Sequence, residues 1–223
     1  QLFINPLVPD PNDENYLYYL SGSQLWRNNA VSLIPNFENK TTSGWTQLTN
    51  NSAPSNYNYT AIAISKTNIS DVLYFGASFA NPNLTQQPPK LYKLNNARTS
   101  TTAAIDLSSA LAGAGVTAGS YISSIAVNPN NSDEVIVVVS NYAVPSLFYT
   151  ADGGAKFVDI EGNLSNDSWG GTVGPSIRFA SILPFSSGTV YLVGTSTGLY
   201  STTDIDTPSP LWRIEGDQII GNV

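Results

Sequence analysis

Four short apolar runs recur along the chain, and a leucine follows each of them a few residues later. The runs are YLYYL (16–20), VLYFG (72–76), VIVVV (135–139) and VYLVG (190–194). They consist of β-branched and aromatic residues, and a nearly continuous apolar run of this length is typical of a strand that is covered on both sides. The leucines that mark the next strand are Leu25, Leu91, Leu147 and Leu199. The pattern therefore predicts four copies of one β unit.

Each unit reads as strand, polar turn, strand, loop, strand, polar turn and strand. The first turn is rich in Asn, Pro, Ser or Asp, as in Asn128-Pro129, and these residues favour tight reversals. A fourth strand is expected around Trp45, Ile105, Phe157 and Trp212. The units span 1–50, 58–108, 121–163 and 176–223. A helical pattern occurs only in residues 106–115, where Asp106 can cap one short turn.

Four strands per unit, at a period of roughly 50 residues, favour a β-propeller. We therefore expect an all-β chain whose residues 1–223 form a single propeller module of four-stranded antiparallel blades, four of them recognisable. A β-sandwich and a solenoid of hairpins are the alternatives. The chain has no methionine and begins without an apolar leader, which favours a piece of a longer protein with further blades or domains.

The third unit contains the stretch YTADGGAKF (149–157), in which Thr150, Asp152, Gly154 and Phe157 have a recognisable spacing. The stretch resembles the Asp-box, or bacterial neuraminidase repeat, whose pattern is Ser/Thr-x-Asp-x-Gly-x-x-aromatic. A weaker copy in the fourth unit, with an insertion before its aromatic residue, keeps Thr202, Asp204 and Trp212. Units one and two keep only the chain reversal.

The resemblance implies a structural role for this turn. A short Asp side chain can accept hydrogen bonds from N–H groups of its own turn, Gly can adopt a left-handed conformation, and the aromatic ring can cover the interface between blades. In Asp-box propellers these turns lie on the side opposite to the ligand. The motif therefore predicts an architecture and not an activity.

Composition removes several classes of function. The chain has 9 basic and 16 acidic residues, a net charge of −7, which disfavours binding to nucleic acid. It contains no Cys and no His, so it offers neither serine–histidine or cysteine–histidine catalysis nor His- or Cys-ligated metal centres. We expect no cofactor, no metal and no membrane span. The abundance of amide and hydroxyl side chains favours a secreted or cell-surface bacterial protein.

Carboxylates, Tyr, Lys and Arg remain as candidates for catalysis. Sialidases, which carry the Asp-box repeat, resemble one another in three arginines that hold the substrate. This chain has four arginines, and only Arg178, in SIRFASILP, loosely resembles the Arg-Ile-Pro signature of that family. Xyloglucanase-like propellers use two carboxylates that face each other across a cleft. Asp159 and Glu161 are the candidate pair, on one face of a strand. The alternative is that both are charges that prevent edge pairing.

Function is expected on the side of the propeller that carries the long loops. Strand parity places the Asp-box turn and the turns after each first strand on one side, and all other connections on the opposite side. Long loops on a rigid scaffold are the usual carriers of function. Four aromatic residues assigned to these loops are candidate contacts for a ligand: Trp169, Tyr142, Tyr57 and Phe79.

The sequence therefore favours an extracellular binding module for a saccharide or protein ligand, with no catalytic residue identified. One alternative is a fragment of a carboxylate-dependent glycoside hydrolase of the xyloglucanase-like or sialidase-like type. Another is a receptor-like or assembly-factor propeller with a protein partner.

Overall fold

The computed structural model describes residues 5–35, 40–140, 144–165, 174–207 and 209–216. The strands in this part of the chain are β1 Leu7–Pro9, β2 Leu17–Ser21, β3 Gln24–Asn28, β4 Trp45–Gln47, β5 Tyr57–Ile64, β6 Leu73–Phe79, β7 Lys90–Leu94, β8 Ile105–Asp106, β9 Ile122–Asn128, β10 Asn131–Val139, β11 Leu147–Thr150, β12 Val158–Asp159, β13 Ile177–Phe185, β14 Gly188–Thr195, β15 Gly198–Thr202 and β16 Arg213–Ile214. They form four antiparallel sheets of four strands, each in sequence order. The predicted all-β class and four-stranded blades are confirmed.

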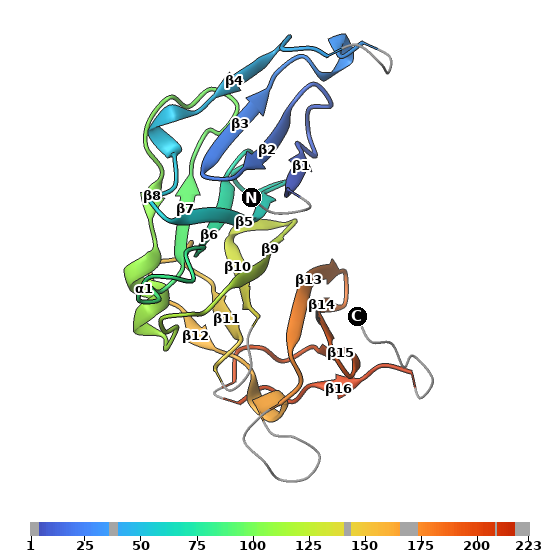
Figure 1. Ribbon diagram of the computed structural model, residues 1–223. Coiled ribbons are helices and arrows are strands. Elements are labelled where there is room, and N and C mark those ends of the chain that lie inside the picture. Colours follow the sequence, from blue (N-terminus) through green and yellow to red (C-terminus); the bar gives the residue numbers. More distant parts are fainter. Residues whose placement is uncertain (1–4, 36–39, 141–143, 166–173, 208, 217–223) are drawn as a thin grey trace.

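The four sheets follow one another along a curved arc, from β1–β4 in blue to β13–β16 in red (Figure 1). The first strands of neighbouring sheets contact one another: β1 contacts β5, β5 contacts β9, and β9 contacts β13. These strands line the inner side of the arc, whereas the fourth strands lie at its outer edge (Figure 1). Radial sheets with this strand order are the blades of a β-propeller.

Helical segments are short and lie in the connections between strands. Helix α1 (Ser108–Gly113) joins the second blade to the third, and Oδ1 of Asp106 accepts a hydrogen bond from the Ser108 N–H at 2.8 Å. Three 3₁₀ segments span Val31–Leu33, Thr49–Asn51 and Gly162–Ser165. In the part of the chain that the structure describes, no helix is long and apolar enough to cross a membrane.

The predicted second and third strands are confirmed, and the four blades share one register. The four apolar runs lie in β2, β6, β10 and β14, and the recurrent leucines lie in β3, β7, β11 and β15. Each leucine stands opposite one residue of the second strand: Leu20 opposite Leu25, Gly76 opposite Leu91, Val138 opposite Leu147 and Gly194 opposite Leu199. Equivalent positions of the four blades can therefore be compared directly.

Each blade has a forward face, toward the next blade along the chain, and a rear face, toward the preceding blade. Leu25, Leu91 and Leu147 lie on forward faces and are 0% exposed. They belong to three separate hydrophobic cores, one between each pair of adjacent blades. Gly76 lets the second and third blades approach closely, because a Cβ at this position would lie 2.8 Å from Cγ2 of Ile122.

Polar side chains also connect neighbouring blades. Arg98 of the second blade binds the fully buried carboxylate of Asp10 in the first blade, through Nε at 2.9 Å and NH2 at 2.7 Å. Lys93 donates to Asp133 of the third blade at 2.9 Å. The Arg98–Asp10 pair fixes the relative position of the first two blades, because removal of the arginine would leave the buried Asp10 carboxylate unpaired.

The connections lie on two opposite sides of the arc, as strand parity predicts. On one side, here the turn side, the N–H of Gly153 donates to the Asp133 carbonyl, and a third-to-fourth turn thus meets a first-to-second turn. On the other side, here the loop side, the N–H of Ala53 donates to the Ser23 carbonyl, so a second-to-third turn meets the connection between blades. Long connections occur on both sides, since the connections from β6 to β7 and from β8 to β9 lie on the loop side and those from β3 to β4 and from β7 to β8 lie on the turn side. The long loops are therefore not confined to the loop side, contrary to the prediction from the sequence.

Candidate functional site

The Asp-box-like turn of the third blade lies on the turn side and is held by hydrogen bonds between its own residues. Oδ1 of Asp152 accepts the Thr150 hydroxyl at 2.7 Å and the Lys156 N–H at 3.0 Å. The pKa of the Asp152 carboxyl is lowered, first by the Thr150 hydroxyl and then by backbone N–H groups of the turn. Gly154 has a φ of +95°. Phe157 is buried in the core shared with the second blade. The hydrogen bonds stabilise the turn itself, and Phe157 connects it to the neighbouring blade.

The weaker copy in the fourth blade keeps fewer of these contacts. The N–H of Asp204 donates to Oγ1 of Thr202 at 3.3 Å, and the Asp204 side chain is exposed. Trp212 is buried, and its indole N–H donates to the carbonyl of Ile160 in the third blade at 2.8 Å. The aromatic residue of this copy therefore anchors two blades together.

Two of the four candidate ligand contacts occupy strand ends and not loops. Tyr57 is the first residue of β5 and Phe79 is the last residue of β6, and they stand opposite each other. Their rings pack edge to face at 5.3 Å between centroids, and the Tyr57 hydroxyl donates to the Pro88 carbonyl at 2.9 Å. Tyr57 is only 8% exposed. The prediction that these two residues lie in loops is wrong. Tyr142 and Trp169 lie outside the described residues.

Tyr57 nevertheless borders a groove on the loop side, between the first and second blades. The groove has a volume of about 380 Å³ and is lined by Ser23, residues 53–58 and residues 80–82. Asn56, whose φ is +66°, fixes its floor: its carbonyl accepts the Ala80 N–H at 2.8 Å, and its side chain accepts the Asn81 amide at 3.1 Å. We call it the loop-side groove.

Several polar groups of the loop-side groove are free to meet a ligand. Within the residues that the structure describes, the Asn58 amide and the hydroxyls of Ser23 and Ser55 have no hydrogen-bond partner. None of the lining residues is charged. The groove thus offers hydrogen-bond donors and acceptors and carries no net charge.

Among the residues that the structure describes, Glu161 is the carboxyl group on the loop side whose pKa is raised. Its Oε1 accepts the N–H of Ser146, at the start of β11, at 3.0 Å. Burial raises the pKa of the Glu161 carboxyl to about 7, and the nearby Asp159 contributes to the rise. A carboxyl group with this pKa carries a proton for part of the time at neutral pH and can donate it.

The predicted strand-face arrangement of Asp159 and Glu161 is wrong. Strand β12 ends at Asp159, and the chain turns there because Oδ1 of Asp159 accepts the N–H of Glu161 at 2.9 Å. Glu161 has a counterpart in the second blade, where Oγ of Ser108 accepts the Leu91 N–H at 3.1 Å. Both side chains extend the pairing between a fourth and a third strand. Glu161 therefore has a structural role in addition to its acidity.

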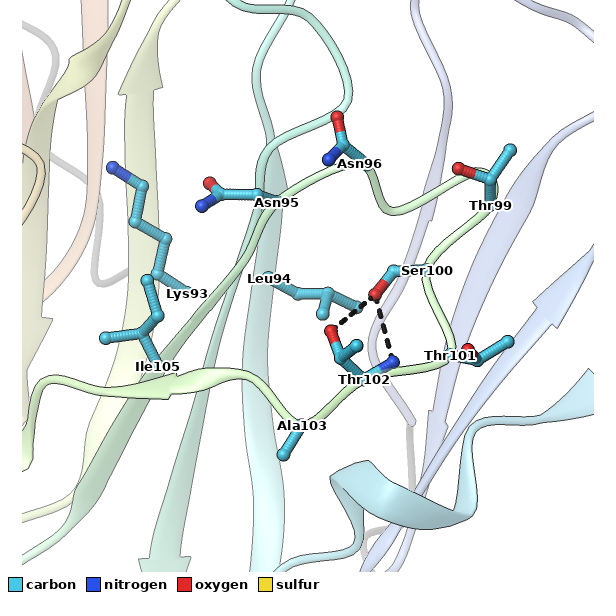
Figure 2. Close-up of a pocket in the computed structure, with 10 residues that line it drawn as sticks. All are labelled: Lys93, Leu94, Asn95, Asn96, Thr99, Ser100, Thr101, Thr102, Ala103 and Ile105. Carbon is cyan, nitrogen blue, oxygen red and sulfur yellow. Dashed lines mark hydrogen bonds between the residues drawn. The ribbon is translucent and has the colours of Figure 1, made fainter.

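A second hollow, of about 350 Å³, lies on the turn side of the second blade (Figure 2). The hydroxyls of Ser100 and Thr102 bond each other at 3.1 Å, and the ammonium group of Lys93 is paired with Asp133. Among the residues that the structure describes, no aromatic side chain lines this hollow. Of these two hollows, the loop-side groove is therefore the better candidate for a binding site.

No protein-family model matches the sequence, and no curated protein matches it. The structure is similar to the GH74 enzyme of Niastella koreensis, with a TM-score of 0.60 and 14% identity over 92% of this chain and 30% of that enzyme. It is also similar to an ancestral GH74 enzyme, with a TM-score of 0.53 and 12% identity over 94% of this chain and 32% of that enzyme. The chain thus spans about a third of the length of two GH74 enzymes and shares their β-propeller fold.

Proposed function

We propose that this chain is a saccharide-binding segment of a glycoside hydrolase-like β-propeller. The observation that carries the proposal is the loop-side groove, which is lined by Asn58, Ser23 and Ser55, whose amide and hydroxyl groups are free. Amides and hydroxyls recognise sugar hydroxyl groups. The likeness to two GH74 enzymes supports this class of ligand.

The charge of the groove and of the whole chain favours a neutral saccharide as the ligand. The groove contains no charged lining residue, and the chain carries a net charge of −7. A saccharide with carboxylate groups, such as a sialic acid, would be repelled by this surface. A sialidase-like site would require three arginines, but two of the four in this chain are engaged elsewhere: Arg98 binds Asp10, and Arg27 donates to the Ala97 carbonyl at 2.8 Å. A neutral polysaccharide of the xyloglucan type fits better.

The same proposal assigns the remaining motifs. The turn at 150–157 is an Asp-box that stabilises its blade, and the protein acts on the cell surface or in secreted form, where polysaccharides are met. Trp169 and Tyr142 are further contacts for the saccharide. Glu161 is the acid that would protonate a glycosidic oxygen, because glycoside hydrolysis needs one protonated and one ionised carboxyl group.

Titration calorimetry with xyloglucan oligosaccharides and with sialyllactose tests the binding site. We expect the neutral oligosaccharides to bind, and Asn58→Ala to weaken the affinity about fivefold, since a lost hydrogen bond costs about 1 kcal/mol. Asn95→Ala, in the turn-side hollow, is the matched control and should leave the dissociation constant unchanged. If sialyllactose bound more tightly than the neutral oligosaccharides, or if Asn58→Ala and Asn95→Ala lost the same affinity, the loop-side groove would not be the site of a neutral saccharide.

Release of reducing sugar distinguishes catalysis from binding alone. If Glu161 is the acid, wild-type protein releases reducing ends from xyloglucan, and Glu161→Gln abolishes release while the dissociation constant stays within twofold. Binding without release would refute the catalytic role and leave the chain as a saccharide-binding segment.

A further inference from the structure

Six Asn-x-Ser/Thr triplets lie in the described part of the chain, and such a triplet can accept an N-linked glycan in a secreted protein. They begin at Asn50, Asn58, Asn68, Asn83, Asn130 and Asn163. Two further triplets begin at Asn39 and Asn166, outside the described residues. A folded chain accepts the bulky glycan only where the side-chain amide and the hydroxyl of one triplet can be reached together. The structure separates the six triplets by this criterion.

Two triplets have an asparagine whose amide is engaged with a distant segment. The amide of Asn163 donates to the Trp212 carbonyl at 2.9 Å, and its oxygen accepts the Trp212 N–H at 2.7 Å. The amide of Asn50 donates to the Thr101 carbonyl at 2.8 Å. A glycan on either nitrogen would force these segments apart, so neither asparagine is a suitable acceptor in the folded protein.

Three other triplets are held by the packing of neighbouring strands and blades. Thr60 and Ser132 supply the hydroxyls of two of them and are 7% and 0% exposed. The Thr60 hydroxyl bonds that of Ser78 at 3.1 Å, and the Ser132 hydroxyl donates to the Asn68 carbonyl at 2.8 Å. The third of these triplets begins at Asn68, whose amide donates to Oδ1 of Asn131 in the next blade at 3.5 Å. None of the three offers a free amide and a free hydroxyl together.

The triplet Asn83-Leu84-Thr85 differs from the other five. It lies in the connection from β6 to β7, on the loop side, and all three residues are exposed. No other described residue bonds to the Asn83 amide or to the Thr85 hydroxyl. The main chain is nevertheless held in a turn, because Oδ1 of Asn81 accepts the Asn83 N–H at 3.1 Å. Amide and hydroxyl are therefore presented together to solvent.

We propose that Asn83 is an N-glycosylation site of the folded protein. In the transfer, Nδ2 of Asn83 bonds to the anomeric carbon of an oligosaccharide that is carried on a lipid pyrophosphate. The bond from that carbon to the pyrophosphate oxygen breaks, the lipid pyrophosphate leaves with the electron pair, and Nδ2 gives up one of its two protons. The proposal relies on the secreted or cell-surface location proposed above, and it does not require the loop-side groove to bind a saccharide.

A glycan at Asn83 would cover an apolar residue and stand at the edge of the loop-side groove. Leu84, the middle residue of the triplet, is apolar and 50% exposed. Pro82, directly before Asn83, lines the groove, whereas Asn83 itself does not. The glycan would thus shield the loop and leave the groove open.

Transfer of a glycan to the purified protein tests the proposal. The full chain, made without glycans in bacteria, is incubated in its folded state with a single-subunit oligosaccharyltransferase that accepts Asn-x-Ser/Thr and with its lipid-linked oligosaccharide. The intact mass should rise by one glycan, and peptide mapping should place it on Asn83. Thr85→Ala should abolish the transfer, whereas Thr85→Ser should retain it, because serine supplies the same hydroxyl.

A tryptic digest of the same protein is the matched control. In the digest, the triplets that begin at Asn130 and Asn163 should also accept glycans, because the fold and not their sequence protects them. No transfer to the folded chain, or transfer to Asn130 or Asn163 of the folded chain at the level of Asn83, would overturn the proposal. Neither readout uses saccharide affinity, so failure of this proposal and failure of the proposed binding site are distinguishable.

Discussion

Replacement of Glu161 by glutamine should stabilise the protein at neutral and alkaline pH and have no effect in acid. Burial raises the pKa of this carboxyl from an ordinary 4.5 to about 7. The folded state thus binds the Glu161 proton more tightly than the unfolded state does. The contribution of this group to stability is fully present below pH 4.5 and is lost as the pH rises through about 7. Glutamine keeps an acceptor for the Ser146 N–H but never becomes charged.

The expected gain in the free energy of unfolding follows from the rise in the pKa of Glu161. About 1.4 kcal/mol per pKa unit gives an upper bound of about 3 kcal/mol for the rise from 4.5 to about 7. Because the carboxyl group is partly exposed, solvent screening reduces this figure to on the order of 1–2 kcal/mol.

Urea unfolding of wild type and Glu161→Gln at pH 4.5 and pH 8 measures the difference. The two proteins should be equally stable at pH 4.5, and the variant should be more stable by on the order of 1–2 kcal/mol at pH 8. Glu14→Gln, at an exposed position of the first blade, is the control and should show no such change. A difference between wild type and Glu161→Gln that is the same at both pH values would refute the raised pKa.

Three other substitutions probe packing between and within the blades. Asp152→Ala removes the acceptor of the Thr150 hydroxyl and should lower stability by about 1–2 kcal/mol without changing saccharide affinity; a weaker affinity at an unchanged melting temperature would contradict its structural role. Leu147→Ala opens a cavity in the core between the third and fourth blades and should cost about 2–5 kcal/mol in urea unfolding, and a loss below 1 kcal/mol would show that this core is loosely packed. Trp212→Phe loses the bond to the Ile160 carbonyl and should lower the melting temperature by an amount equivalent to about 1–2 kcal/mol, whereas an unchanged melting temperature would mean that the bond contributes nothing.

The strands could be predicted from the sequence because their signal is local. A run such as VIVVV is apolar on both faces, and a leucine follows after a loop, so the blade pattern survives loops of different length. Strand parity then predicted the side on which each turn lies, because a four-stranded meander allows only one arrangement of its turns. No long-range information was needed for these conclusions.

The site could be predicted only in part, because loop residues are positioned by distant partners. The sequence places Tyr57 in a loop, but in the structure its hydroxyl donates a hydrogen bond to the carbonyl of Pro88, which lies 31 residues away along the chain. Glu161 was expected to continue a strand, and one hydrogen bond from its own N–H to Asp159 ends that strand. The loop-side groove combines residues 53–58 with residues 80–82, which no local pattern connects.

The three hydrophobic cores lie between blades and not within them, and this arrangement determines how the protein unfolds. A sheet at either end of the arc contributes to one core, whereas each of the two middle sheets contributes to two. The free energy of folding is therefore close to a sum over neighbouring pairs, as in linear repeat proteins. Unfolding of an end blade disrupts one hydrophobic core, whereas unfolding of a middle blade disrupts two. Amide hydrogens of β6 and β10 should consequently exchange with solvent more slowly than those of β2 and β14.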